Sequence, residues 1–421
     1  MTDKLKIEGG EPLIGEVPIA GAKNAALKIL AASILSHEPV YISNLPHLRD
    51  ITLMLELLVE LGCKITLHAP LAVEINPATL SSRTVSYDLV KAMRASIVVL
   101  GPLLARYGEA NVALPGGCAI GARPIDVHLD GLKAMGAEIE LEGGFVKARA
   151  PKGLQGASIY MRVVSVTGTE NLLMAATLAK GVTVLDNCAC EPEVVDLANF
   201  LIKMGAKIEG AGTPRISITG VKKLHGTRHH VLGDRIEAGT YLVAAAMTRG
   251  RVTIRNIAPE IMTNIIEKLT EAGAVIEIGQ EAITLDMRGR ALRSVNIVTA
   301  PYPGFATDMQ AQFMALNTIA EGSGHITETI FENRFMHLPE LQRLGAKIAV
   351  NGITATCEGV SQLVGAPVVA RDLRASACLV LAGLAAKGTT ILEGVHHMDR
   401  GYEYLEEKFM RLGAKIHRVA E

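Results

Sequence analysis

The sequence has no tryptophan and few other aromatic residues, which narrows the classes of partner it can bind. Phenylalanine and tyrosine supply 7 and 8 of the 421 residues, and the formal net charge is -1 with lysine and arginine scattered along the chain. Nucleic-acid binding usually needs a basic field and rings on which bases can stack. The composition therefore predicts no nucleic-acid partner, and an anionic ligand would have to be met by a local site.

Long apolar runs are also missing, although 49% of the residues are hydrophobic. A membrane-spanning helix needs about 20 consecutive apolar residues, and the candidate at residues 96–105 is interrupted by Gly101 and Pro102. The first residues, MTDKLK, lack the apolar core of a signal peptide. We therefore expect a cytoplasmic protein without a membrane insertion; the sequence does not indicate its oligomeric state.

Cysteine is sparse as well, with six residues in the whole chain. That number is too small for a disulfide framework, and no cysteine pair has the spacing and nearby histidines of a zinc site. One cysteine, Cys118, stands in a glycine-rich loop that runs from Leu114 to Pro124 and also carries Arg123. Taken alone, this loop is either an ordinary turn with a small apolar cysteine or a ligand-binding loop with a reactive thiol.

One short phrase recurs along the chain, a hydrophobic residue followed by glycine, a small residue, a variable residue and isoleucine. Its glycines are Gly62, Gly136, Gly205, Gly273, Gly345 and Gly413, which lie 74, 69, 68, 72 and 68 residues apart. Each copy closes an amphipathic helix and leads into a strand, with glycine as the helix-terminating residue. The period suits a small α/β unit, so the pattern predicts six repeats of strands and two helices.

A second helix in each repeat is apolar nearly all round, which predicts that it is enclosed. These helices are expected at residues 25–35, 95–105, 171–179, 238–247, 309–319 and 375–386. Six repeats divide into two domains of three, with a polar junction near residues 222–230. A cleft between two such halves is a favoured position for a ligand.

The repeats allow the charged residues at the starts of the enclosed helices to be aligned. They are Lys23, Arg94, Glu170, Glu237, Asp308 and Arg374. The helix dipole favours acids there and disfavours cations by about 0.3 to 1 kcal/mol, so the acids have a structural explanation and the cations do not. A bound anion would offset that cost, which makes a phosphate or carboxylate ligand one interpretation and a solvated helix end the other. Asp308, near such an anion, would suit a general base.

Several motifs together resemble those of the UDP-N-acetylglucosamine 1-carboxyvinyltransferases, also called enolpyruvyl UDP-N-acetylglucosamine transferases. The motifs are GAKNAAL at 21–27, MRAS at 93–96, LPGGC at 114–118 with IGARP at 120–124, TDMQAQ at 307–312, ENRFMH at 332–337 and DLRAS at 372–376. The resemblance runs from end to end. It implies an α/β fold of two similar inside-out barrel domains, residues 23–232 and residues 1–22 plus 233–421, with the active site in the cleft between them.

The resemblance also implies the reaction and the residues that perform it. The enolpyruvyl group of phosphoenolpyruvate would move to the 3-hydroxyl of UDP-N-acetylglucosamine, with release of phosphate and without a metal or organic cofactor. The catalytic residues would be the general acid Cys118, the base Asp308, and Lys23 and Arg400. Phosphoenolpyruvate would be held by Lys23, Asn24, Arg123 and Arg400. The UDP-sugar would be bound by Arg94, Arg123, Pro124, Ile125, Asp126, Val127, Val163, Val164, Ser165, Val166, Asp308 and Ile330.

Two alternatives remain beside this hypothesis. One is the sister enzyme that transfers the enolpyruvyl group to shikimate 3-phosphate, whose motifs would lack the loop Gly116-Gly117-Cys118. The other is a non-catalytic repeat scaffold, against which the set Lys23, Cys118, Asp308 and Arg400 argues. Thr167 is a position of expected variation whose effect the sequence does not reveal.

The role of Cys118 generates a first testable prediction. A thiol among cations has a lowered pKa and reacts with electrophiles, so fosfomycin should alkylate it. We expect Cys118→Ser to lose most turnover and all adduct formation, and Cys118→Asp to keep turnover and lose the adduct, because a carboxyl group can still deliver a proton. Phosphate-release assays and intact-protein mass spectrometry measure both quantities. Equal inactivation of the wild type and the Asp variant by fosfomycin would refute the thiol assignment.

Overall fold

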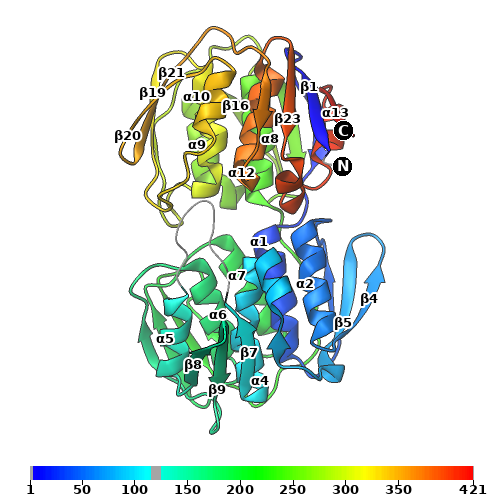
Figure 1. Cartoon of the computed structure of the whole chain (residues 1–421), viewed down its shortest axis with the longest axis vertical. Helices are drawn as coiled ribbons and strands as arrows, with labels where there is room; N and C mark the ends of the chain where they lie inside the picture. Colours follow the sequence, from blue (N-terminus) through cyan, green and yellow to red (C-terminus); the bar gives the residue numbers. More distant parts are fainter. Residues whose placement is uncertain (1–2, 115–124, 421) are drawn as a thin grey trace. The chain divides into compact units, whose positions relative to one another are not determined.

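The computed structural model describes residues 3–114 and 125–420, and these fall into two compact units (Figure 1). One unit, here the split unit, consists of residues 3–20 and 233–420; the other, the continuous unit, consists of residues 21–114 and 125–232. Each has its own hydrophobic core. Cys118, Arg123 and Pro124 lie outside the described residues. Among the helices that are described, none is long and apolar enough to cross a membrane.

The described residues form six four-stranded sheets, which confirms the predicted six-fold repetition. In each sheet, with its strands taken in the order given below, the first two strands pair in parallel and the remaining neighbours pair antiparallel. In the continuous unit the strand orders are β14 (Arg228–His230), β3 (Val40–Ser43), β5 (Ala72–Asn76), β4 (Lys64–His68); β6 (Thr84–Val85), β7 (Glu109–Ala113), β9 (Phe145–Arg149), β8 (Glu138–Glu142); and β10 (Ser158–Tyr160), β11 (Val182–Asp186), β13 (Arg215–Thr219), β12 (Lys207–Glu209).

The split unit repeats this arrangement with two strands from the beginning of the chain. Its orders are β2 (Ile14–Pro18), β15 (Arg251–Arg255), β17 (Ala282–Asp286), β16 (Val275–Ile278); β18 (Ile297–Val298), β19 (Ser323–Thr327), β21 (Thr354–Glu358), β20 (Lys347–Asn351); and β22 (Pro367–Val369), β23 (Thr389–Glu393), β1 (Lys4–Glu8), β24 (Lys415–Val419). Strand β1 pairs with both β23 and β24, and β2 pairs with β15. The segments Lys4–Glu8 and Ile14–Pro18 are therefore integral parts of this unit.

The recurring glycines end the outer helices as the sequence predicts. These helices are α2 (Arg49–Glu60), α5 (Asp126–Ala134), α7 (Pro192–Lys203), α9 (Thr263–Glu271), α11 (Leu338–Arg343) and α13 (Leu405–Arg411). The six glycines that follow have φ between 91° and 104°, a conformation that strains any residue with a Cβ atom. Each glycine thus turns the chain from a helix into the strand after it.

The inner helices are buried on nearly every side, which confirms the prediction that they are enclosed. They comprise α1 (Lys23–Ala32) with η1 (Ser33–Leu35), η3 (Arg94–Val99) with α4 (Leu100–Tyr107), α6 (Val166–Ala176), α8 (Arg235–Met247), η5 (Thr307–Met309) with α10 (Gln310–Thr318), and α12 (Leu373–Ala385). Figure 1 shows α10 and α12 of the split unit between the strands β19 to β21 and the strands β1 and β23. Further short helices are α3 (Tyr87–Ala92), η2 (Pro77–Thr79), η4 (Pro259–Met262) and η6 (Val395–Arg400).

The structure changes the interpretation of two acids that the sequence places at helix starts. Helix α6 begins at Val166, so Glu170 lies in its second turn and is fully buried instead of facing the helix dipole. Its Oε2 atom lies 3.3 Å from Nζ of Lys28 on α1. Burial raises the pKa of Glu170 to about 7, although the charge of Lys28 opposes this shift. Glu237, also buried, is 2.6 Å from Nζ of Lys408. Both acids are thus members of internal ion pairs.

The buried Glu170 predicts how stability depends on pH. Its pKa rises from 4.5 to about 7 on folding, so between these values the native state holds a proton that the unfolded state has lost. The contribution of Glu170 to the free energy of unfolding therefore falls as the pH rises through this window. Glu170→Gln removes this titration, and we expect a slope shallower by up to about 1.4 kcal/mol per pH unit in urea unfolding at pH 5 to 8.

The matched control for this experiment is Glu109→Gln, at an exposed position on β7. It should leave the slope of the wild type unchanged. Equal slopes for the wild type and Glu170→Gln would show that Glu170 does not titrate in this range.

Candidate active site

The predicted site residues that the structure describes form two sets, one in each unit. The continuous unit carries Lys23, Asn24, Arg94, Ile125, Asp126, Val127, Val163, Val164, Ser165 and Val166, and the split unit carries Asp308, Ile330 and Arg400. In the continuous unit these residues stand at the beginning of a helix or shortly before one, whereas in the split unit only Asp308 does. We describe each set within its own unit.

Lys23 is the first residue of α1 and is buried. Its Nζ atom lies 2.7 Å from Oδ2 of Asp50, a buried residue in the first turn of α2. A cation at this end of a helix opposes the helix dipole, and the carboxylate of Asp50 offsets that cost from within the protein. Asp50 could not be predicted from the sequence, because it lies 27 residues from Lys23 and belongs to no motif. The ion pair fixes the position of the ammonium group at the start of α1.

The residues predicted to bind the UDP-sugar lie around the starts of three helices in the continuous unit. Arg94 begins η3, Asp126 begins α5, and Ser165 caps α6 by accepting a hydrogen bond from the backbone N–H of Gly168 at 3.1 Å. Helix α6 packs against both η3 and α5. Val163, just before the cap, is 63% exposed and thus available to a ligand. The structure therefore brings these three predicted segments together.

Asp308 in the split unit is clamped by two arginines. One carboxylate oxygen lies 2.8 Å from Nη2 of Arg334, and the other lies 2.9 Å from Nη2 of Arg374. Both guanidinium groups are buried, whereas 27% of the Asp308 side chain is exposed. Burial opposes ionisation, but the charges of Arg374 and Arg334 outweigh it and hold the pKa of Asp308 well below its usual range. Asp308 is thus an ionised carboxylate that attracts protons only weakly in this arrangement.

The clamp also explains a cation that the sequence left without a structural reason. Arg374 is the second residue of α12, whose N-terminus is capped by Asp372 through the N–H groups of Arg374 and Ala375, both at 2.9 Å. The guanidinium group of Arg374 has an internal carboxylate partner in Asp308. An anionic ligand is therefore not required to offset the unfavourable helix dipole at this position.

Glu328 organises the chain around Ile330, and sequence reasoning missed it. This buried carboxylate accepts hydrogen bonds from the backbone N–H groups of Ile330 at 2.8 Å and Phe331 at 3.2 Å, and from the Thr307 hydroxyl at 2.8 Å. Thr307 in turn accepts a bond from Arg334 at 3.0 Å. A charged residue that follows a strand is the only sequence signal that could have indicated it. Glu328 links the Ile330 segment to the segment of Asp308.

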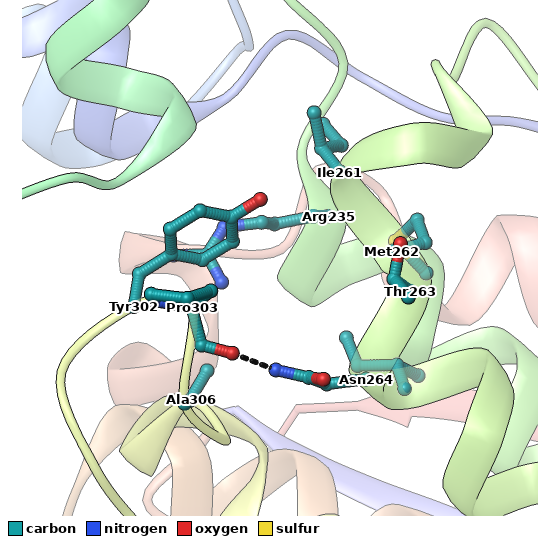
Figure 2. Close-up of a pocket in the computed structure, with 10 residues that line it drawn as sticks. Arg235, Ile261, Met262, Thr263, Asn264, Tyr302, Pro303 and Ala306 are labelled. Carbon is teal, nitrogen blue, oxygen red and sulfur yellow. Dashed lines mark hydrogen bonds between the residues drawn. The ribbon is translucent and has the colours of Figure 1, made fainter. Parts of the chain in front are cut away.

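A cavity of about 200 Å³ lies against the segment that leads into Asp308 (Figure 2). Its lining comes from the start of α8, from η4 and α9, and from residues 302–306. The guanidinium group of Arg235 lies over the ring of Tyr302, 5.5 Å from its centroid, and the Asn264 side chain donates a hydrogen bond to the Pro303 carbonyl. None of the predicted site residues that the structure describes lines this cavity.

Arg400 is the last residue of η6 and is partly buried. Cys118 and Arg123, the predicted acid and a predicted phosphoenolpyruvate ligand, lie outside the described residues, as does Pro124. Among residues 3–114 and 125–420, no group of three histidine, cysteine, aspartate or glutamate side chains is placed to hold a metal ion. The charged groups in the described part of the site are therefore carboxylates paired with cations near helix starts.

The family model of EPSP synthase (3-phosphoshikimate 1-carboxyvinyltransferase) matches residues 7–409. The chain therefore belongs to this family of carboxyvinyl transferases. Within it, the chain is 59% identical to the UDP-N-acetylglucosamine 1-carboxyvinyltransferases of Coxiella burnetii strains Dugway 5J108-111 and RSA 331 over 418 residues, which are 99% of this chain and 96% of each relative.

Solved structures agree with this assignment. The enolpyruvyl transferase NikO from Streptomyces tendae superposes with a TM-score of 0.89 at 26% identity, covering 100% of this chain and 99% of that one. EPSP synthase from Acinetobacter baumannii superposes with a TM-score of 0.77 at 19% identity, covering 100% of both chains. At that low identity the second likeness shows the shared fold alone.

The arginine clamp predicts a shift in the titration of Asp308. Because Arg374 favours the ionised carboxylate, Arg374→Met should raise the pKa of Asp308 by about 1 to 3 units. The measurement is the midpoint of the Asp308 carboxyl signal in a carbon-13 NMR titration of labelled protein. The exposed neighbour provides the control, since Arg371→Met removes one positive charge from the same segment without breaking an ion pair to Asp308. An identical midpoint in all three proteins would show that Arg374 does not set this pKa.

Proposed function

We propose that this chain transfers the enolpyruvyl group of phosphoenolpyruvate to the 3-hydroxyl of UDP-N-acetylglucosamine and releases phosphate, the first committed step of peptidoglycan synthesis. The observation that carries the proposal is the 59% identity to enzymes named for this reaction, extending over 99% of the chain. The nucleotide-sugar acceptor is favoured over shikimate 3-phosphate because identity to the EPSP synthase from Acinetobacter baumannii is 19%. The reaction would take place in the cytoplasm.

The chemistry needs an acid and a base that act on opposite sides of the substrate pair. A proton is added to the methylene carbon of phosphoenolpyruvate while the sugar oxygen bonds to the neighbouring carbon, which gives a tetrahedral intermediate. Loss of a proton from the new methyl group and of phosphate then restores the double bond. We assign the acid to Cys118 and the base to Asp308. Lys23, Asn24, Arg123 and Arg400 hold phosphoenolpyruvate, and the cations stabilise the charges of the intermediate.

The arginine clamp gives the proposed base a dependence on its substrates. While both ion pairs are intact, Asp308 is a weak proton acceptor. The negative charges of bound phosphoenolpyruvate would offset part of the positive charge that Arg334 and Arg374 direct at Asp308. Weakening either ion pair raises the pKa of Asp308 and makes it a stronger base. The sugar hydroxyl would thus lose its proton most readily when the second substrate is present.

The acceptor side of the site is supported by the three helix starts of the continuous unit. Backbone N–H groups at a helix N-terminus attract phosphate, and Arg94 adds a positive charge there. We assign the UDP-sugar to Arg94, to residues 123–127 and 163–166, and to Asp308 and Ile330. The exposed Val163 and the capped start of α6 present an accessible surface for such a ligand.

A substrate test decides between the candidate functions. The purified chain should release phosphate from phosphoenolpyruvate with UDP-N-acetylglucosamine, and should release none with shikimate 3-phosphate. Mass spectrometry of the product should show the acceptor with an added enolpyruvyl group. Release with shikimate 3-phosphate alone would assign the sister activity, and release with neither acceptor would leave a non-catalytic member of the family.

The proposed base is tested by substitution of Asp308. Asp308→Ala should fold with a lower melting temperature, because two buried guanidinium groups lose their carboxylate partner. It should lose at least about 100-fold in kcat, because general base catalysis typically contributes that much. Circular dichroism checks the fold and phosphate release measures kcat. Glu340→Ala, an acid on α11 of the same unit, is the control and should keep kcat. Near-normal turnover of Asp308→Ala would remove Asp308 from the mechanism.

A further inference from the structure

A network of hydrogen-bonded, buried polar side chains joins the three helix starts to which the acceptor is assigned. At its centre is Asn171 of α6, which is fully buried. Its Oδ1 atom accepts a hydrogen bond from the backbone N–H of Gly101 at 2.8 Å, and its Nδ2 atom donates to the carbonyl of Ile97 at 3.1 Å. Both partners belong to the inner helix that Arg94 begins. Asn171 thus connects α6 to η3 and α4.

The hydrogen-bond network continues from Asn171 to His128 of α5. Nδ2 of Asn171 lies 2.9 Å from Nδ1 of His128, and Nε2 of His128 lies 3.5 Å from Oγ1 of Thr167 in the first turn of α6. The imidazole is 2% exposed. His128 is therefore held between two points on α6, one in the first turn and one in the second, and it belongs to the helix that begins at Asp126.

The hydrogen-bond directions fix the state of the imidazole. The N–H of Gly101 can only donate, so it must meet the Asn171 oxygen, and the amide nitrogen faces His128 as a donor. Nδ1 of His128 is then an acceptor, and Nε2 carries the proton that points to Thr167. Burial lowers the pKa of His128 to about 4, which keeps the ring neutral at physiological pH. A neutral ring with one donor and one acceptor matches its two partners.

Two glycines show that the backbone segments around this hydrogen-bond network are closely packed. A Cβ atom at Gly101 would lie 2.4 Å from Oδ1 of Asn171, and one at Gly168 would lie 2.9 Å from Cγ1 of Val127. Real Cβ atoms do not approach other atoms so closely. The first turn of α6 is thus packed directly against Val127, one of the residues assigned to the UDP-sugar.

We propose that His128 is a positioning residue for the nucleotide-sugar acceptor, holding residues 125–127 and 163–166 in one arrangement and tying both to the helix of Arg94. The proposal rests on the function proposed above. A ligand that spans three separate helix starts is bound well only while those starts keep their mutual positions, since each misplaced contact is lost from the binding energy. His128 itself does not touch the substrates.

The placement of the phosphoenolpyruvate residues makes the expected effect selective. Lys23 and Asn24 lie on α1, and Lys23 is held by Asp50, which is not part of the hydrogen-bond network of His128. Loss of the His128 contacts should therefore disturb the acceptor side alone. A residue needed only for general stability would not separate the two substrates in this way.

The test compares three substitutions of His128. His128→Leu fills the space and removes both polar contacts, His128→Asn keeps an acceptor near the Nδ1 position, and His128→Gln keeps a donor near the Nε2 position. We expect His128→Leu to raise the KM for UDP-N-acetylglucosamine at least tenfold, with the KM for phosphoenolpyruvate and kcat changed less than threefold. His128→Asn and His128→Gln should each recover part of this loss.

A second histidine of the same unit provides the matched control. His229 on β14 is 4% exposed and pairs at 3.0 Å with Asp196, which belongs to α7 and to none of the three helix starts. His229→Gln should lower the melting temperature without separating the two KM values. Should His128→Leu fail to fold, Thr167→Val, which removes the hydroxyl but keeps the shape, supplies the same measurement with a smaller expected increase of two- to fivefold.

The outcomes distinguish this proposal from the one on which it rests. If the wild type uses UDP-N-acetylglucosamine and His128→Leu raises both KM values equally, or neither, His128 is a structural residue and the positioning role is overturned. If calorimetric titration shows that the wild type does not bind UDP-N-acetylglucosamine, the proposed function fails, and the positioning role fails with it.

Discussion

Enclosure of the inner helices is the constraint on which the rest of the structure depends. A helix that is buried all round has no solvated face, so every polar side chain on it must find a partner inside the protein or bear a desolvation cost. Helix α6 meets this demand with Lys28 for Glu170 and with His128 for Asn171. In the split unit, Gln312 donates hydrogen bonds to Thr240 and Tyr402, both at 3.2 Å. Buried polar pairs consequently connect one inner helix to another. Because the helices are fixed to one another, the positions of their starts are fixed as well.

The same constraint accounts for the form of the candidate site. Only the ends of enclosed helices can present charged groups to a ligand, and there the orientation of the dipole places a penalty on cations. The protein offsets this penalty internally, with Asp50 beside Lys23 and with Asp308 beside Arg374. The cations are thereby held in place before a substrate arrives. Such an arrangement avoids reorganisation at the moment of reaction, which is the physical basis of electrostatic stabilisation in enzymes.

Periodic features of the sequence predict the fold well, whereas contacts between residues far apart in the sequence cannot be predicted from it. Six glycines with similar spacing and apolar helices predict six repeats, because helix termination and burial are local properties of sequence. The apolar pattern predicts that helix α6 begins at residue 171, later than its true start at Val166, because Val166 to Gly168 include β-branched and glycine residues that weaken a helical pattern. Asp50, Glu328 and His128 could not be predicted as partners, because their contacts depend on how distant segments pack. The Asp308 clamp likewise joins residues 26 and 66 positions apart.

The two strands donated by residues 4–18 have a consequence for the order in which the chain acquires its structure. Strand β1 completes a sheet whose other members, β22, β23 and β24, lie between residues 367 and 419, so strands that are far apart in the sequence must pair. The continuous unit, complete at residue 232, can fold while β1 and β2 are still without their partners. Closing so long a loop costs entropy, so we expect the split unit to form more slowly than the continuous unit. Both connections between the units, near residues 20 and 232, must then accommodate a neighbour that has already folded.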